Sequence, residues 1–206
     1  MSVPQRGDGA ATRSLPSRRL TLQELVLLAT LSVVFGFLYW ALVQLWGPLR
    51  VAMGPLGDLA QNVLIGGWFV VAPLAIYIVR KPLVGVTTEI LASVIEVVFL
   101  GSPVGPILLL TGLVQGTGSE LPFFLTRYRR YTWTTFGLSG LSAALFSLVY
   151  NMVRLGWAGQ DWFAVRVGFQ AVSGLVLGGL AAKVIGDALY HTGVLDNYPI
   201  GRAVSA

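Results

Sequence analysis

The chain has 206 residues, of which 55% are hydrophobic and only 11% are charged, and its formal net charge is +5. Soluble domains carry roughly 25% charged residues, so this composition indicates a membrane protein. The chain has no cysteine and a single histidine, His191, which excludes a disulfide framework, a thiolate metal site and a multi-histidine metal centre. We therefore expect neither a metal nor a cofactor.

The elements follow from the apolar runs between charged residues. Residues 1–20 are polar and contain proline and glycine, which predicts a disordered basic tail. Uncharged runs long enough to cross a bilayer predict helices near 22–46, 58–79, 132–154 and 163–188. The stretch 83–127 holds two more helices, separated by a turn at "LGSPVGP", residues 100–106. The prediction is an all-α domain of six transmembrane helices over 21–190, followed by a tail over 191–206.

The distribution of lysine and arginine predicts the orientation in the cell membrane. With six spans both termini share a side, and that side holds eleven of the basic residues. The other side holds three, namely Arg50, Arg154 and Arg166. Lysine and arginine are enriched in cytoplasmic loops, so both termini, with the tails 1–20 and 191–206, are predicted to be cytoplasmic.

Polar and aromatic residues fall into two layers along the predicted helices. The outer layer consists of Asn62, Glu96, Asn151, Gln170, Trp68, Trp40 and Tyr150. It combines a carboxylate, several amides and flat rings, which suits a flat, nitrogen-rich and positively charged ligand. Two purely structural interpretations stay open: Trp40 as an anchor at the membrane surface, and Gln170 as a link between helices.

The inner layer consists of Glu89 and Glu120. A carboxylate inside a membrane helix costs about 2.5–3.5 kcal/mol and needs a partner. Glu89 lies seven residues before Glu96, so both face the same way on one helix. Glu89 and Glu120 either contact a ligand or pair with the basic residues Arg80, Lys81 and Arg127.

Catalytic functions find little support in the sequence. Neither Lys81 nor Lys183 follows a glycine, so the chain has no phosphate-binding GxxxxGK[ST] loop, and energy from ATP would have to come from another subunit. The segment "GLSG", residues 137–140, has the form found in rhomboid intramembrane proteases. A serine nucleophile needs a histidine base nearby, and His191 lies past the end of the last predicted helix, far from Ser139. Close helix packing is the better interpretation of this small-residue segment.

Two long segments carry a family resemblance. They are "GGWFVVAPLAIYIVRKPLVGVTTEILASVIEVVFLGSPVG" and "GLVQGTGSELPFFLTRYRRYTW". Both resemble the S components of energy-coupling factor (ECF) vitamin importers, most closely the YkoE-type family assigned to thiamin or its hydroxymethylpyrimidine precursor. The resemblance extends over about residues 22 to 190.

The resemblance implies a six-helix subunit that binds a vitamin near its outer face. Such a subunit docks on a transmembrane coupling protein that carries two cytoplasmic ATPases. Gln115 would face the pocket floor, and a small-residue seam of Ala29, Ser32 and Gly36 on the first helix would meet the coupling protein. The expected function is capture of thiamin or hydroxymethylpyrimidine for ATP-driven import. The alternatives are an intramembrane serine protease and a stand-alone transporter driven by proton binding at Glu89 or Glu120.

Overall fold

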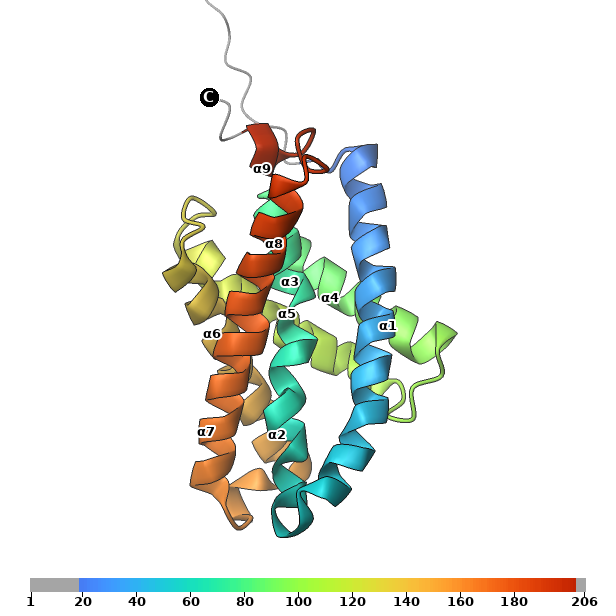
Figure 1. Cartoon of the computed structure of the whole chain (residues 1–206), viewed down its shortest axis with the longest axis vertical. Coiled ribbons are helices and arrows are strands. Elements are labelled where there is room, and N and C mark those ends of the chain that lie inside the picture. The colour runs from blue at the N-terminus through green and yellow to red at the C-terminus, as the bar shows by residue number, and fades with distance from the viewer. Residues whose placement is uncertain (1–18, 203–206) are drawn as a thin grey trace, which may run out of the picture.

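The computed structural model describes residues 19–202, and within this range every regular element is a helix. Most of the tail predicted to be disordered therefore lies outside the described residues. Figure 1 shows α1 (Leu22–Ala52), α6 (Trp133–Leu155), and the run of α7 (Phe163–Ser173) and α8 (Ala181–His191) along the long axis. Behind them, α4 (Val84–Val94) and α5 (Ile107–Leu125) cross obliquely.

Several long helices change their winding along their length. The second run consists of η1 (Gly54–Leu59), α2 (Ala60–Leu64), η2 (Ile65–Phe69) and α3 (Val71–Val79), in which η1 and η2 are 3₁₀-helices. A π-helix, η3 (Ile95–Phe99), continues α4, and another, η5 (Gly174–Leu180), joins α7 to α8. The short helices η4 (Trp157–Gly159) and α9 (Pro199–Arg202) complete the described chain. Such π-helical segments inside helices often mark functional sites.

Four of the described helical runs are long and apolar enough to cross a membrane. They are Leu22–Ala52, Gly54–Val79, Trp133–Leu155 and Phe163–His191. Each agrees with one of the predicted spans. The two other predicted spans correspond to the run 84–99 and to α5, which do not meet the same measure of length and hydropathy.

Local sequence explains where the helices begin and end. Thr21 and Glu24 form a capping box at the start of α1, in which each side chain accepts a hydrogen bond from the other residue's backbone N–H. Between α3 and α4, Arg80 and Leu83 adopt left-handed backbone conformations on either side of Pro82. Gly156 ends α6 with a φ of 65°, a conformation that glycine adopts without steric cost.

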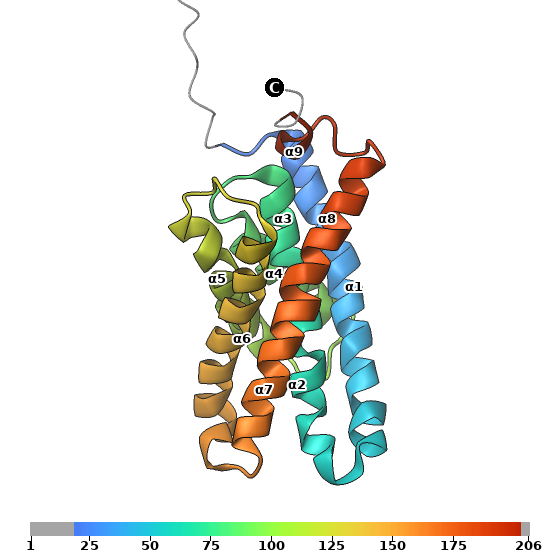
Figure 2. The same cartoon turned by 60° about the vertical axis from the view of Figure 1, so that its left-hand side comes forward.

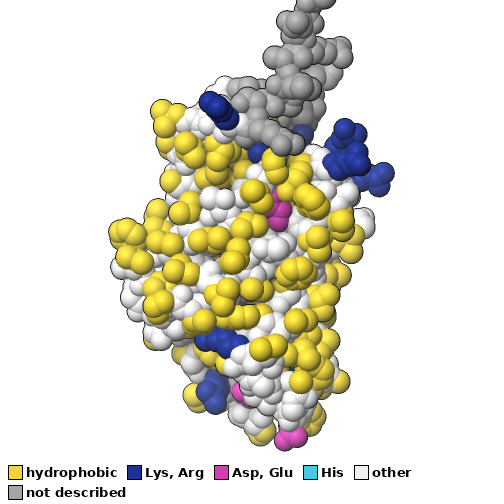
Figure 3. Space-filling model, turned by 180° about the vertical axis from the view of Figure 1, so that it is seen from behind, with side chains coloured by type: hydrophobic (Ala, Val, Ile, Leu, Met, Phe, Trp, Pro, Cys, Tyr) yellow, Lys and Arg dark blue, Asp and Glu magenta, His cyan; other side chains and the backbone are white. Residues whose placement is uncertain are grey.

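The core lies around α3, in which every residue is buried. By contrast, the outward sides of the surrounding helices expose leucine, valine and phenylalanine. Figure 3 shows apolar side chains over most of the middle of one face, with basic side chains toward its two ends. The start of α1 and the short α9 lie at the same end of the bundle (Figures 1 and 2). An apolar girdle around a buried central helix is the arrangement expected in a bilayer.

Glycines bring α6 and η5 into backbone contact. A Cβ atom on Gly140 would lie 2.0 Å from the carbonyl oxygen of Gly174, and one on Gly179 would lie 2.2 Å from that of Phe136. Real Cβ atoms do not approach backbone so closely. The prediction that the small residues around 137–140 serve helix packing is therefore confirmed for Gly140.

We expect Gly140→Ala to lower the free energy of unfolding by about 1–3 kcal/mol, because the added methyl group must push two backbones apart. Gly168→Ala in α7 is the matched control, since nothing lies within 4 Å of its Cβ position. The control should leave stability unchanged or raise it by about 0.5–1 kcal/mol. Equilibrium unfolding of both variants in detergent measures the difference; equal stabilities would contradict the close contact.

Candidate functional site

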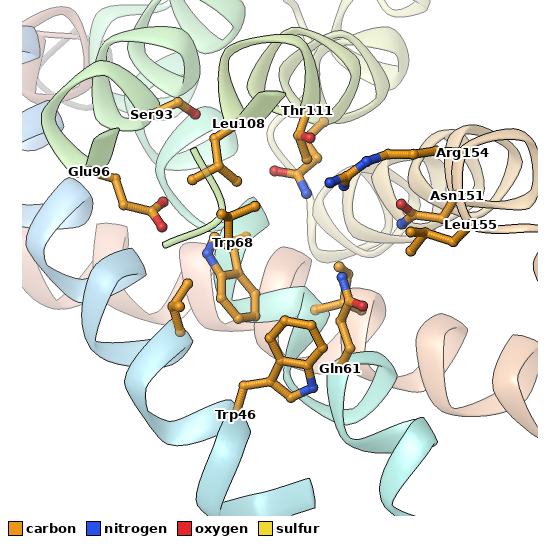
Figure 4. Close-up of a pocket in the computed structure, with 14 residues that line it drawn as sticks. Trp46, Gln61, Trp68, Ser93, Glu96, Leu108, Thr111, Asn151, Arg154 and Leu155 are labelled. Carbon is orange, nitrogen blue, oxygen red and sulfur yellow. The ribbon is translucent and has the colours of Figure 1, made fainter. Parts of the chain in front are cut away.

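A cavity of about 120 Å³ lies between the first four helical runs and α6. We call it the ligand cavity, and Figure 4 shows the side chains that line it. The lining residues come from α1, α2, η2, α4, η3, the loop 100–106, α5 and α6: Val43, Trp46, Gln61, Ile65, Trp68, Ser93, Glu96, Val104, Leu108, Thr111, Gln115, Asn151, Arg154 and Leu155. It is concave and largely apolar with a few polar groups, as small-molecule sites are.

Glu96 supplies the carboxylate of the ligand cavity. It stands on the π-helix η3, and the residue is only 1% exposed. Its Oε1 accepts a hydrogen bond from the Ser102 hydroxyl at 2.9 Å, and the Ser102 N–H donates to the Glu96 carbonyl oxygen at 3.1 Å. Its Oε2 has no hydrogen-bond partner among the described residues. The loop thus fixes the carboxylate and leaves one oxygen for a ligand.

Two tryptophans form the aromatic part of the wall. Trp68 lies on η2 and is buried, and Trp46 lies on α1 and is half-buried. Figure 4 shows their rings next to each other on one side of the cavity. Flat aromatic faces bind planar or positively charged rings.

The remaining polar groups are three amides, one guanidinium and the hydroxyls of Ser93 and Thr111, which donate to backbone carbonyl oxygens of their own helices. The amides are Gln61, Gln115 and Asn151, and none of their side chains forms a hydrogen bond with another described residue. Arg154 follows Asn151 by three residues on α6, and Figure 4 shows both on the side of the cavity opposite Glu96. Amides with unused donors and acceptors in a cavity wall can pair with the heteroatoms of a ligand.

Four of the residues predicted from sequence to contact a ligand therefore line the cavity, namely Glu96, Trp68, Gln115 and Asn151. Their contact with a ligand stays a prediction. The other six lie elsewhere.

Asn62 and Gln170 belong to a separate hydrogen-bond network outside the ligand cavity. The Asn62 amide donates to Gln170 Oε1 at 2.7 Å, and the Gln170 amide donates to the Ala144 carbonyl oxygen at 2.8 Å. Arg166 donates to Asn62 Oδ1 at 2.9 Å and pairs with Asp58. The network joins α2, α6 and α7, which fits the helix-linking interpretation of Gln170.

Glu89 is fully buried one helical turn before Ser93 on α4, and it does not line the ligand cavity. Its Oε2 accepts a hydrogen bond from the Tyr39 hydroxyl at 3.2 Å, while Oε1 has no partner among the described residues. The Tyr39 oxygen also accepts from the Val71 N–H at 3.4 Å. Glu89 therefore connects α4 to α1 and α3, and no described basic residue pairs with it.

Glu120 holds the start of α4. Its Oε1 accepts hydrogen bonds from the Leu83 N–H and, at 2.6 Å, from the Tyr128 hydroxyl, and its Oε2 accepts from the Val86 N–H at 2.9 Å. Free N–H groups at a helix start carry partial positive charge, which stabilises a carboxylate there. Of the two sequence-based alternatives, a ligand contact or a basic partner, neither describes these contacts: the partners of Glu120 are backbone and tyrosine donors.

Trp40 and Tyr150 lie away from the cavity. The Trp40 ring stacks on Phe37, with 5.9 Å between the ring centroids. Tyr150 lies along an apolar surface groove with Val114 and Leu145. This position of Trp40 fits the membrane-anchor interpretation.

The predicted docking seam on α1 is mostly covered by the chain itself. Ser32 is buried and its hydroxyl donates to Leu28 and Thr88 carbonyl oxygens at 2.8 and 3.4 Å. A Cβ on Gly36 would lie 2.7 Å from Ile95 Cβ. These two residues pack α1 against α4 and η3, whereas Ala29 is exposed. The seam is corrected accordingly: of the three residues, only Ala29 is open to a partner.

The protease alternative has no support in the geometry. Ser139 is fully buried, and its hydroxyl donates to the Ser119 carbonyl oxygen at 2.6 Å. His191 lies at the end of α8, where its ring contacts Tyr190. Among the described residues there is also no group of three histidine, cysteine or acidic side chains that could hold a metal ion.

Sequence reasoning missed several residues of the wall. Trp46 and Arg154 are the most prominent, because Arg154 counted only as a topology signal and Trp46 lies at a predicted span end. A usable signal was present: Arg154 lies one helical turn after Asn151 and therefore on the same face of α6.

Comparisons with known proteins agree with this architecture. Residues 23–146 match the family described as "ABC-type cobalt transport system, permease component". The chain is 31% identical over 183 residues to a protein of Bacillus subtilis (strain 168) with the provisional name HMP/thiamine permease protein YkoE, covering 88% of this chain and 90% of that protein. It also superposes on the crystal structure of an S component of an ECF transporter with a TM-score of 0.84, at 30% identity, covering 91% of this chain and 94% of that one.

The relatives are non-enzymatic, integral membrane subunits of transporters, and the apolar helices of this chain agree with such a location. The fold, the identity and the coverage converge on one assignment. The chain belongs to the family of membrane-embedded S components of ECF transporters.

Proposed function

We propose that this protein captures thiamin or its hydroxymethylpyrimidine precursor from the outer side of the membrane for ATP-driven import. The observation that carries this proposal is the ligand cavity, in which Glu96 faces two tryptophans and three unpaired amides. An aminopyrimidine offers a flat ring, ring nitrogens and an amino group. The rings would stack on it, the amides would pair with its nitrogens, and Glu96 would accept from its amino group.

We further propose that six helices cross the membrane, with the run 84–99 and α5 as the two short spans and with both termini in the cytoplasm. Two features support this orientation. The start of α1 and the end of α8 lie at one end of the bundle (Figures 1 and 2). Arg50, Arg154 and Arg166 all lie toward the other end, where the positive-inside rule leaves few basic residues.

The energy for import would come from partner subunits, because this chain has no phosphate-binding loop. We propose a transmembrane coupling protein with two cytoplasmic ATPases as the partners. The exposed side of α1 that carries Ala29 would take part in docking, since small residues let membrane helices approach closely.

Isothermal titration of the purified chain tests the proposal. Thiamin, hydroxymethylpyrimidine and riboflavin are compared in detergent solution. We expect at least one of the two pyrimidine ligands to bind at micromolar concentration or below, and riboflavin to bind more weakly. Absence of binding by both pyrimidine ligands would reject the proposed substrate class.

A further inference from the structure

The three arginines on the proposed outer side gather around two adjoining cavities. The second cavity, which we call the vestibule, has a volume of about 220 Å³. It shares Trp46, Gln61 and Leu155 with the ligand cavity, and its other lining residues are Arg50, Gly57, Asp58, Trp157, Gln160 and Arg166. Arg154 lines the ligand cavity beside Leu155. Because basic residues are disfavoured in short outer loops, their collection at one place indicates a function.

The charges of the ligand cavity are separated. Among its lining residues only Glu96 and Arg154 are charged, and Figure 4 shows them on opposite sides with Trp68 between them. Arg154 takes part in none of the ion pairs that the described residues form, and its guanidinium lies 6.0 Å from the Tyr150 ring centroid. The cavity is therefore built for a ligand with a donor-rich end and an acceptor-rich or anionic end.

The vestibule adds to the positive side. Arg166 is 1% exposed, lies 4.5 Å from the Trp157 ring centroid, and pairs with Asp58. Its Nε is buried without a hydrogen-bond partner in the described part of the chain. Among the residues that line the vestibule and the adjoining wall of the ligand cavity, Asp58 offsets the charge of Arg166, and Arg50 and Arg154 add positive charge.

We propose that Arg154, together with Arg50, forms a subsite for a phosphate group on the ligand, so that the site takes the phosphate monoester of the vitamin at least as well as the free alcohol. This inference rests on the proposed function, with the aminopyrimidine at Glu96 and Trp68. A guanidinium binds two phosphate oxygens at once, which makes arginine the preferred partner of phosphate. Free thiamin brings only positive charge past these arginines, whereas its monophosphate brings an anion.

Titration calorimetry with thiamin, thiamin monophosphate and inorganic phosphate tests the subsite. The full chain is compared with Arg154→Gln, Arg50→Gln and Arg154→Lys. The matched control is Arg129→Gln, which removes the same charge from an exposed residue that lines neither cavity. We expect the monophosphate to bind at least as tightly as thiamin, and Arg154→Gln to shift the ratio of the two affinities by about tenfold or more against the monophosphate.

The other variants show whether the ratio of the two affinities depends on these particular arginines. Arg50→Gln should shift the ratio in the same direction by a smaller factor, Arg154→Lys should recover part of the loss, and Arg129→Gln should leave the ratio unchanged. A ratio that stays the same in both glutamine variants, or a monophosphate that binds more weakly than thiamin, would overturn the subsite while the proposed function stands. Inorganic phosphate that binds as tightly as the monophosphate would overturn its assignment to the ligand. If thiamin, thiamin monophosphate and hydroxymethylpyrimidine all fail to bind, the proposed function itself is rejected, and the subsite with it.

Discussion

Glu96→Gln should weaken vitamin binding by about tenfold or more. The substitution keeps the shape of the side chain and one acceptor oxygen but removes the charge, and a hydrogen bond to a charged group contributes about 1.5–3 kcal/mol. That range corresponds to roughly tenfold or more in the dissociation constant. The carboxylate is 1% exposed and held by Ser102, so a ligand amino group would meet it at a fixed position. Titration calorimetry with the tighter-binding pyrimidine ligand measures the loss.

Glu89→Gln is the matched control for this result. It makes the same change seven residues earlier on the same helical run, but Glu89 does not line the ligand cavity. We expect a smaller loss of affinity than for Glu96→Gln. A reversed ranking would place the ligand nearer the end of the bundle that holds the start of α1. Equal thermal unfolding of the two variants would show that any difference in affinity is not a difference in folding.

The sequence was sufficient for part of the fold and part of the site. Long uncharged runs predicted the four helical runs that are long and apolar enough to cross a membrane. The length of such a run is informative because a helix pairs its own backbone groups and can therefore cross hydrocarbon. The predicted depth of Glu96, Trp68 and Asn151 agrees with their common place around the cavity. Depth was a good guide here because side chains at similar heights on neighbouring helices can meet.

Depth does not give the direction in which a side chain points around its helix. Asn62 has the predicted depth, yet it faces Gln170 and Arg166 and forms a network beside the cavity. Position along a helix also gives depth directly only for an upright helix, whereas α4 and α5 cross obliquely (Figure 1). Arg154 was missed for a related reason: in a count of basic residues it was equivalent to Arg50, and only the fold shows its place in the wall.

Ser32 and Gly36 show a further limit. Small residues on a membrane helix indicate close contact with another helix, but the pattern does not say whether that helix belongs to the same chain. Here Ser32 donates to a carbonyl oxygen of α4, and Gly36 faces Ile95 of η3. The pattern was interpreted correctly as a contact and assigned to the wrong neighbour.

Glu120→Ala should lower the free energy of unfolding by about 3 kcal/mol and leave vitamin affinity within about threefold. The carboxylate accepts from two backbone N–H groups at the start of α4 and from the Tyr128 hydroxyl. Removal of a buried acceptor leaves these donors unpaired, at about 1–3 kcal/mol for each unsatisfied group. Burial is the larger cause, and the hydrogen bond to Glu120 the second, of a pKa of Tyr128 above its ordinary value of 10.0. Its hydroxyl therefore stays protonated, and remains a donor, well beyond neutral pH. Because Glu120 does not line the ligand cavity, its loss acts on the fold.

Tyr128→Phe gives the milder companion variant, since it removes only one of the three donors and should cost about 1 kcal/mol. Equilibrium unfolding in detergent and titration calorimetry on the same preparations separate the two possible roles of Glu120. If Glu120 caps α4, Glu120→Ala lowers the free energy of unfolding more than Tyr128→Phe does, and both folded variants keep their affinity for the vitamin. A carboxylate that contacts the ligand would show the opposite pattern, with unfolding as in the parent chain and at least tenfold weaker binding in Glu120→Ala alone. That pattern would move the ligand away from Glu96, toward Glu120 and the start of α4.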